Sequence, residues 1–357
     1  LLGSITKNHP ADWIDLGSNR WGTVKGTFPG DVGFIMLGNE NQNNTGIKLI
    51  QNMNDVDSDR EFWYDLQDKR IVLYCTQNPA NAYPNIEIAY SEDHHGHVIS
   101  ASGINDVIVD SIALKYFNAH GMSLSSVRGI TVRNCDITFG GGQIQYDEVR
   151  FGNGIEFWGS AQDCLVEHCK IGEIYDAAVT NQGNGFNSEI NITYRNNLLW
   201  NSEYLYEYWN GPENSTTKDI YFLNNTCLKA GFGWAHDQRP DPSGRSLCFY
   251  QNLATIQNFN IQGNIFIEST LSCFWLSSTW GDLGELDVNF NSYYQATGNL
   301  INYQGSLYTM AQFSLYQGEK GQDINSTTPS LTSIKDEARN ISRPEDLTFL
   351  NSILDTI

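Results

Sequence analysis

Acidic residues recur at one point of a short repeated segment, and they are the first candidates for chemistry. The segments read His120-Gly-Met-Ser-Leu, Asn153-Gly-Ile-Glu-Phe-Trp, Ala177-Ala-Val-Thr-Asn-Gln and Leu205-Tyr-Glu-Tyr-Trp. Aligning their central apolar residues places Glu156 and Glu207 in one column with Ser123 and Thr180, and Asp176 directly precedes the third segment. Two carboxyl groups on one face can serve as general acid and general base. We therefore expect catalysis by two of Glu156, Asp176 and Glu207.

The spacing of the two glutamates bears on the type of reaction. If the segments are strands on successive turns, Glu156 and Glu207 lie two strand spacings apart, about 9.6 Å. Inverting glycosidases hold their carboxyl groups ~6.5–9.5 Å apart, whereas retaining enzymes need ~5–5.5 Å. The spacing favours inversion, although Asp176 could pair with either glutamate at a shorter distance. For each carboxylate, a solvated corner of the fold or a partner in a side-chain ladder is the alternative interpretation.

Aromatic and polar residues gather around the same column. Flat aromatic faces suit the C–H face of a sugar, and amides and charged groups suit its hydroxyls. We expect about half of the aromatic residues to be core instead, because they favour strands anyway. For His236, an acid–base pair with Asp237 and an ordinary loop histidine both remain open. The predicted substrate-binding residues are His120, Arg150, Trp158, Gln182, Trp209, Trp234, His236 and Arg239.

No metal site or cofactor is predicted. The run Glu92-Asp-His-His-Gly-His holds three histidines, but neighbours on one turn do not easily converge on an ion. The loop that carries Asp147 and Glu148 is expected to be a flexible cleft wall. Calcium remains open, because Asp and Asn oxygens are plentiful. The cysteines at 135, 164, 169 and 227 fall in apolar runs, so we expect small buried side chains rather than disulfides.

The composition is polar without being highly charged. Of 357 residues only 17% are charged, while Asn contributes 37, and the net charge is -20. So many aromatic residues are not typical of a disordered chain. The acidic surface argues against nucleic acid as a partner, and no apolar run is long enough to span a membrane. We expect an exported protein, secreted or periplasmic, whose leader has been removed; the sequence assigns no oligomeric state.

Internal repetition indicates the architecture. An apolar, alternating pattern with an Asn corner starts at residues 107, 130, 164, 190, 220, 259 and 286. Period-two alternation is typical of strands, and units this short must stack on their neighbours to bury their apolar faces. The predicted fold is all-β, a right-handed parallel β-helix with terminal caps and loops on one face. We assign 1–100 to an N-terminal β-rich cap and first turns, 101–308 to the turns with the site, and 309–357 to a C-terminal cap, in one structural domain.

Further motifs resemble a known group of proteins. They are Arg60-Glu-Phe-Trp-Tyr-Asp, Ile71-Val-Leu-Tyr-Cys, Tyr175-Asp-Ala-Ala-Val-Thr-Asn-Gln and Gln317-Gly-Glu-Lys-Gly-Gln-Asp-Ile-Asn-Ser. With the Asn-cornered turns, they make the chain similar to carbohydrate-active right-handed β-helix proteins of the pectate-lyase-like superfamily. It is most similar to glycoside hydrolases of the family 141 type. The resemblance implies the fold and a carbohydrate-active class, which includes hydrolases, lyases and epimerases.

The sequence thus predicts a glycoside hydrolase that acts on plant or algal polysaccharide or oligosaccharide. The first alternative is a polysaccharide lyase, which needs a base and cations to stabilise an acidic sugar. The predicted face is short of cations, unless calcium or a local arginine patch supplies them. The second alternative is a non-catalytic glycan-binding protein, which would present aromatic residues without paired carboxylates.

Overall fold

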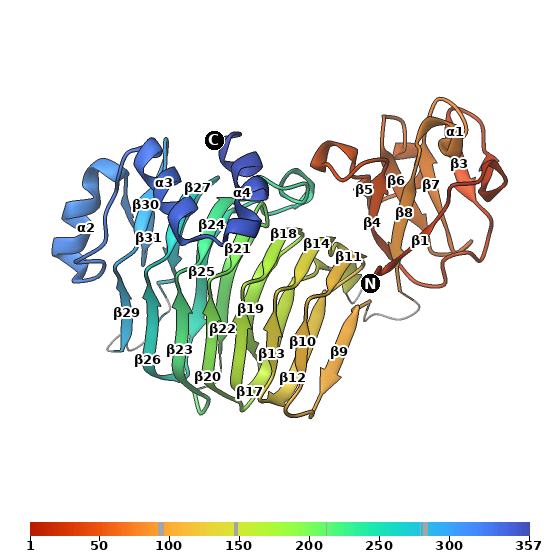
Figure 1. Cartoon of the computed structure of the whole chain (residues 1–357). Coiled ribbons are helices and arrows are strands. Elements are labelled where there is room, and N and C mark those ends of the chain that lie inside the picture. Colours follow the sequence, from red (N-terminus) through yellow and green to blue (C-terminus); the bar gives the residue numbers. More distant parts are fainter. Residues whose placement is uncertain (92–95, 146–148, 212, 279, 281–284) are drawn as a thin grey trace.

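The computed structural model describes residues 1–91, 96–145, 149–211, 213–278, 280 and 285–357. Most of the chain forms stacked parallel strands, with small sheets at one end and helices at the other (Figure 1). No helix in the described ranges is long and apolar enough to cross a membrane. The expectation of a strand-rich chain with stacked parallel strands is confirmed.

The stack contains one sheet of 15 strands and one of seven. The larger sheet has two rows of strands, which meet in the long strand β17 (Ile155–Glu167). The row that carries the predicted site contains β9 (Ile99–Ser102), β12 (Met122–Arg128), the start of β17, β19 (Ala177–Gly183), β22 (Tyr204–Asn210), β25 (Arg245–Asn252), β28 (Ser272–Leu276), β31 (Ile301–Tyr303) and the antiparallel β32 (Ser306–Tyr308). The second row contains β10 (Ile108–Asp110), β13 (Thr131–Arg133), the end of β17, β20 (Ser188–Arg195), β23 (Thr216–Leu223), β26 (Thr255–Gln262) and β29 (Leu286–Asn289).

The seven-stranded sheet is parallel throughout and lies between the two rows in chain order. Its strands are β11 (Ala113–Phe117), β14 (Asp136–Gly140), β18 (Lys170–Ile174), β21 (Leu198–Trp200), β24 (Thr226–Ala230), β27 (Ile265–Ser269) and β30 (Ser292–Tyr294). A separate hairpin pairs β15 (Gln143–Gln145) with β16 (Val149–Phe151). Each repeat thus returns to the same three rows, which is why residues in successive repeats form columns.

The repeated sequence pattern sets the register of the second row with one exception. Cys164 pairs with Ile192, which in turn pairs with Ile220. The predicted fourth repeat therefore starts two residues later than expected, at Ile192 rather than at Ile190. Ile190 is only partly buried whereas Ile192 is fully buried, because the left-handed residue Asn191, with φ of 55°, interrupts the period-two alternation between them.

The corners between rows use left-handed backbone, as the Asn-rich pattern predicts. Asn134, Asn196 and Asn224 adopt φ of 53°, 55° and 53° at equivalent corners, a conformation that Asn tolerates better than most residues. The next residue on two of these turns, and the equivalent residue on two further turns, is a buried Asn, and together these four build a ladder of amides. Each side-chain oxygen accepts the backbone N–H of the preceding rung: Asn225 to Asn197 at 3.0 Å, Asn264 to Asn225 at 2.9 Å and Asn291 to Asn264 at 2.9 Å.

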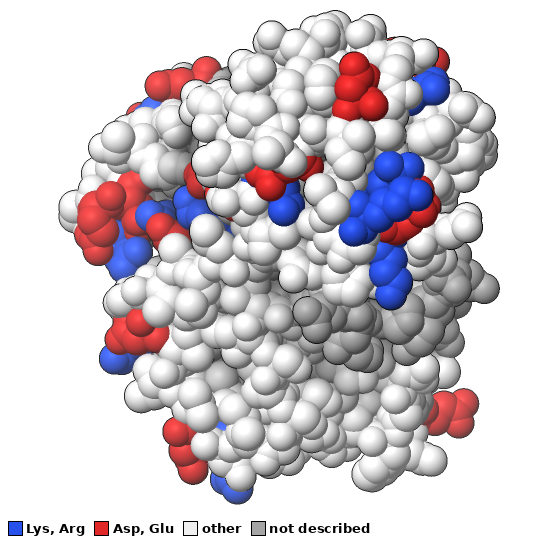
Figure 2. Space-filling model, turned by 90° about the vertical axis from the view of Figure 1, so that its right-hand side faces the viewer, with Lys and Arg blue, Asp and Glu red and all other residues white. Residues whose placement is uncertain are grey.

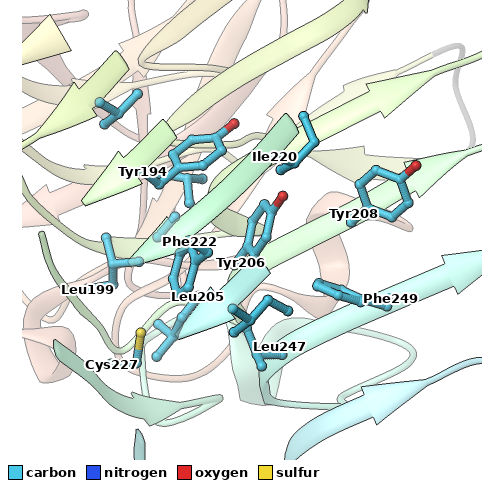
Figure 3. Close-up of a cluster of buried hydrophobic side chains, with 14 of the residues drawn as sticks. Tyr194, Leu199, Leu205, Tyr206, Tyr208, Ile220, Phe222, Cys227, Leu247 and Phe249 are labelled. Atoms are coloured by element: carbon cyan, nitrogen blue, oxygen red, sulfur yellow. The ribbon is translucent and has the colours of Figure 1, made fainter. Parts of the chain in front are cut away.

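Alternating apolar side chains fill the interior of the stack. Tyr206 stacks on Phe222 at 4.7 Å between ring centroids, and Tyr194 lies 5.3 Å from Tyr206 (Figure 3). All seven cysteines are free, and all are buried. The four expected to be small buried side chains are among them.

The N-terminal residues form two sheets with their own core. One is antiparallel, with β1 (Ser4–Thr6), β8 (Ile86–Tyr90) and β4 (Val32–Leu37); the other contains β2 (Trp13–Asp15), β3 (Arg20–Thr23), β7 (Arg70–Tyr74), β6 (Glu61–Asp65) and β5 (Ile47–Leu49). A four-residue helix, α1 (Pro79–Ala82), precedes β8. Their core packs Trp13, Phe28 and Phe62 with strand residues of both sheets.

Three helices follow the last strands. α3 (Leu331–Ile341) and α4 (Leu347–Leu354) cover the seven-stranded sheet, where Ile334 and Leu350 pack with Trp200 and Leu228. α2 (Phe313–Lys320) lies at the end of the stack, where Tyr316 packs 5.4 Å from Tyr308. Figure 2 views the opposite end, and most of the surface it shows carries no charged side chain. This agrees with a composition that is polar mainly through amides and hydroxyls.

Candidate active site

The predicted column of outward residues is present in the structure. Ser123 pairs with Glu156, Glu156 with Thr180, and Thr180 with Glu207, on β12, β17, β19 and β22. The inward neighbours Met122, Ile155, Val179 and Tyr206 pair in the same register and are fully buried. The register prediction is therefore confirmed, and two carboxyl groups share one face of the sheet.

A cleft of about 460 Å³ lies over this column. A volume in this range is typical of a small-molecule or sugar site. Its described lining contains all three predicted catalytic residues, Glu156, Asp176 and Glu207, and also His97, His120, Ser123, Gln145, Phe151, Asn153, Trp158, Gln182, Tyr204, Trp209, Arg239 and Tyr250. Six of the cleft's polar groups are amide, hydroxyl or phenol side chains, which suits neutral hydroxyl-bearing ligands.

Glu156 accepts hydrogen bonds from two neighbouring polar side chains. Ser123 Oγ donates to Oε2 at 3.3 Å, and Asn153 Nδ2 donates to Oε1 at 3.3 Å. His120 Nδ1 accepts the backbone N–H of Asn153 at 2.8 Å, so Nε2 carries the proton in the neutral ring. His120 Nε2 lies 3.3 Å from Glu156 Oε2. Burial still raises the pKa of Glu156 to about 7, and the nearby charge of Asp176 adds to the rise.

Glu207 has fewer partners than Glu156. Gln182, on the strand between the two glutamates, donates its Nε2–H to Glu207 Oε2 at 2.6 Å. Burial raises the pKa of Glu207 to about 8, with Asp176 and Glu156 adding to the rise and Arg239 opposing it. Glu156 and Glu207 are thus both disposed to hold a proton near neutral pH, and Glu207 holds it to the higher pH.

Asp176 lines the cleft and forms an ion pair with Arg239. Its Oδ2 accepts the backbone N–H of Gly152 at 2.9 Å, and Arg239 donates to its Oδ1. Arg239 also donates to the carbonyl of Tyr175 at 2.9 Å and lies over the rings of Tyr175 and Tyr204. The negative charge of Asp176 lies beside the two glutamates and favours their protonated forms.

Aromatic side chains form the walls of the cleft. Trp158 and Trp209 flank Gln182 in the register, with ring centroids 6.3 Å apart at 45°. Tyr204 and Tyr250 join their hydroxyls at 2.9 Å on the neighbouring strands. Both tryptophans are partly exposed, whereas Tyr206 and Tyr208 point into the core. The wall is suited to hold the apolar face of a sugar ring.

Three predicted substrate-binding residues lie outside this lining. Arg150 is buried, and its guanidinium donates to the carbonyls of Gly142 and Gly33. Trp234 packs edge-on to Phe34 at 5.0 Å and donates to the carbonyl of Glu173. Both therefore join the N-terminal sheets to the stack. The other five, His120, Trp158, Gln182, Trp209 and Arg239, are brought together around the carboxyl column.

His236 forms a hydrogen-bonded pair with Glu203, not with Asp237 as considered from the sequence. It lies on the short 3-10 turn His236–Gln238, and its Nδ1 is 2.9 Å from Oε2 of the buried Glu203. Its hydrogen bond to Glu203 raises the pKa of His236. Adjacency to Asp237 in sequence did not identify this partner, because Glu203 comes from the preceding turn of the stack.

A larger cavity of about 700 Å³ lies over the seven-stranded sheet. It is lined by Lys115, Lys170 and Lys229, but each is already engaged: Lys115 with Glu40 at 2.7 Å, Lys170 with Asp136 at 3.2 Å and Lys229 with Thr356 at 2.9 Å. Of its aromatic residues, Trp200 is buried and packs edge-on against Phe349 at 4.8 Å between ring centroids. The paired carboxyl groups therefore favour the smaller cleft as the chemical site.

Known proteins offer distant structural likenesses. No protein-family model and no curated protein match the chain. It is similar to a solved complex of XylC with xylose at 11% identity and a TM-score of 0.46, over 85% of this chain and 75% of that one. It is also similar to a structure described as a glycoside hydrolase, at 9% identity and 0.49, over 94% and 84%. The tailspike protein gp49 of Pseudomonas phage LKA1 is similar at 13% identity and a TM-score of 0.24, over 84% of this chain and 61% of that one.

No group of three or more His, Cys, Asp or Glu side chains suited to a metal occurs in the described part of the chain. Residues 92–95 of the histidine run 92–97 lie outside the described residues, as do Asp147 and Glu148 of the predicted cleft wall. Sequence reasoning missed His97, Gln145, Phe151 and Tyr250 as cleft residues. For Tyr250, the alternating run Leu247-Cys-Phe-Tyr was a usable signal, since it continues the strand pattern of the site row.

Proposed function

We propose that this chain is a glycoside hydrolase built on a right-handed parallel β-helix. The observation that carries the proposal is the pair Glu156 and Glu207, two buried carboxyl groups in one register column under an aromatic-walled cleft. The substrate class is a plant or algal polysaccharide or oligosaccharide, cleaved outside the cell. Membership of the family 141 type is part of this proposal and rests on the sequence motifs.

The two glutamates take different roles. Glu207, with the higher pKa of about 8, is the general acid that protonates the glycosidic oxygen of the leaving sugar. Glu156, whose carboxylate accepts hydrogen bonds from Ser123 and Asn153 and lies 3.3 Å from His120 Nε2, is the general base that takes a proton from water. That water attacks the anomeric carbon as the glycosidic bond breaks. Two strand spacings, about 9.6 Å, leave room for sugar and water, so the product is inverted.

Asp176 and Arg239 act on the pair without donating or accepting the reacting proton. The fixed negative charge of Asp176 raises the pKa of both glutamates, which keeps the acid protonated near neutral pH. The charge also lies close to where an oxocarbenium-like sugar would develop positive charge. Gln182 holds the acid, and the tryptophans on either side of it offer faces for the sugar rings.

The lyase alternative fits the cleft less well. A lyase needs cations to stabilise the carboxylate of an acidic sugar during proton abstraction. The one arginine in the described lining, Arg239, is already paired with Asp176, and the lining includes no lysine. A purely glycan-binding protein would have no reason to bury two carboxyl groups with raised pKa values, because burial of such groups costs stability.

The test is an activity screen of the purified protein on neutral and uronic-acid glycans. A hydrolase releases new reducing ends, and its products do not show the ultraviolet absorbance of unsaturated sugars. A lyase produces that absorbance, and a binding protein gives no product. Glu207→Gln serves as the inactive variant, and Glu213→Gln, at an exposed position, as the matched control. Unsaturated products, or reducing ends released equally by Glu207→Gln, would refute the proposal.

A further inference from the structure

The face that carries Glu207 continues for two more strands beyond it. On β25 and β28 the register runs from Glu207 to Cys248 to Trp275, and from Tyr204 to Arg245 to Ser272. Tyr250, which already lines the cleft, packs edge-on against Trp275 at 5.1 Å between centroids. Arg245 and Trp275 are therefore the next side chains that a glycan would meet on leaving the cleft across β25.

Arg245 differs from the arginine inside the cleft. Its guanidinium carbon lies 4.2 Å from the centre of the Trp275 ring, and its Nη1 lies 3.8 Å from Cys248 Sγ. Among the described residues no carboxylate forms an ion pair with Arg245, and its buried Nε has no hydrogen-bond partner. The side chain is only partly buried. In a chain of net charge -20, this cation faces the substrate side without a neutralising partner.

We propose that Arg245, held over the ring of Trp275, forms a subsite for the carboxylate of a uronic acid. Guanidinium groups bind carboxylates through paired N–H donors, and stacking on an aromatic ring orients those donors. The proposal rests on the proposed function and extends it, naming an otherwise neutral glycan that carries an acidic sugar over β25 and β28, one to two strands or about 5–10 Å across the sheet from the strand of Glu207. The cleft, whose one described arginine is already paired with Asp176, then holds the neutral sugars, and Arg245 beyond it holds the acidic sugar.

Binding can be tested without turnover. Glucuronic and galacturonic acid are titrated against the intact protein, with glucose and galactose as neutral counterparts that lack the carboxylate, and the tryptophan indole N–H signals are followed by NMR. We expect the uronic acids to bind, and Arg245→Met to weaken their binding roughly tenfold or more. Binding of the neutral sugars should not change. Arg128→Met, which removes an exposed arginine paired with Asp163, is the matched control.

Two further measurements keep the outcome decisive if Arg245→Met is unstable. Arg245→Lys keeps the charge but loses the paired donors, so uronic acids should bind it more weakly than wild type. Uronic acid binding to the unaltered protein should weaken as salt rises, since an ion pair is screened. Equal uronic acid affinity in wild type and Arg245→Met, or no effect of salt, would overturn the subsite. If Arg245-dependent binding holds but no glycan is hydrolysed, the subsite stands and the proposed hydrolase fails.

Discussion

Glu156 and Glu207 stand two strands apart in one register column, with Thr180 on the strand between them. Each is buried, and each has a pKa raised towards or above neutrality. Their partners differ, because His120, Ser123 and Asn153 surround the first and Gln182 holds the second. One sheet therefore presents two chemically distinct carboxyl groups at a separation set by strand spacing.

The first prediction concerns pH. The general base Glu156 must be ionised, so activity should rise as pH rises through about 7. The general acid Glu207 must be protonated, so activity should fall as pH rises through about 8. We expect a bell-shaped profile of kcat/KM against pH with its maximum between these values. Because the two carboxyl groups interact, the apparent pKa values of the two limbs describe the pair rather than either residue alone. A flat profile that extends to pH 5 would contradict the assignment.

The second prediction concerns stereochemistry. Because strand spacing places the carboxyl groups about 9.6 Å apart, the first-formed sugar should have the anomeric configuration opposite to that of the bond cleaved. NMR of the anomeric protons during the first minutes of hydrolysis, before mutarotation, measures this. A product of retained configuration would instead indicate that Asp176 acts directly with one glutamate at shorter range.

The third prediction concerns His120 as a positioning residue. Its Nε2–H supports the carboxylate form of Glu156, so His120→Ala should lower kcat by about 10- to 100-fold and move the acidic limb of the profile to higher pH. His120→Gln, whose amide can both accept from Asn153 and donate to Glu156, should recover part of the rate. A fall in stability without movement of that limb would show a merely structural role.

The register of the carboxyl column was predictable from the sequence, and the reason is physical. Apolar residues at Met122, Ile155, Val179 and Tyr206 must all face the interior, and alternation then places the glutamates outside. The same logic identified the Asn corners. It placed the fourth repeat of the second row two residues early, because the left-handed Asn191 interrupts the alternation between Ile190 and Ile192 and the sequence pattern alone does not show this.

Contacts supplied by long insertions were not predictable in the same way. Trp234 and His236 lie beyond β24 on a segment whose path no repeat constrains, and the structure joins them to Phe34 and Glu203. Arg150 was expected to bind substrate, but it is buried against carbonyls of the N-terminal sheets and its own hairpin. The partners of these residues depend on segments far away in the sequence.

The fourth prediction concerns the amide ladder. Asn225→Ala removes the acceptor of the Asn197 backbone N–H and the donor to the carbonyl of Tyr194, leaving buried polar groups unpaired. We expect the free energy of unfolding to fall by about 3 kcal/mol. Asn184→Ala, in an exposed loop, should change it by less than about 0.5 kcal/mol. Chemical denaturation measures both, and equal stabilities would show that the ladder contributes little.

The most direct test of the carboxyl pair is hydrolysis by Glu156→Gln and Glu207→Gln, measured as reducing ends released from the best neutral glycan of the activity screen. Each substitution keeps the shape of the side chain but removes its proton chemistry. We predict that each lowers kcat by about 10³-fold or more, with circular dichroism and thermal unfolding showing a folded protein. Wild-type turnover by either variant would contradict the assignment of Glu156 and Glu207 as the catalytic pair.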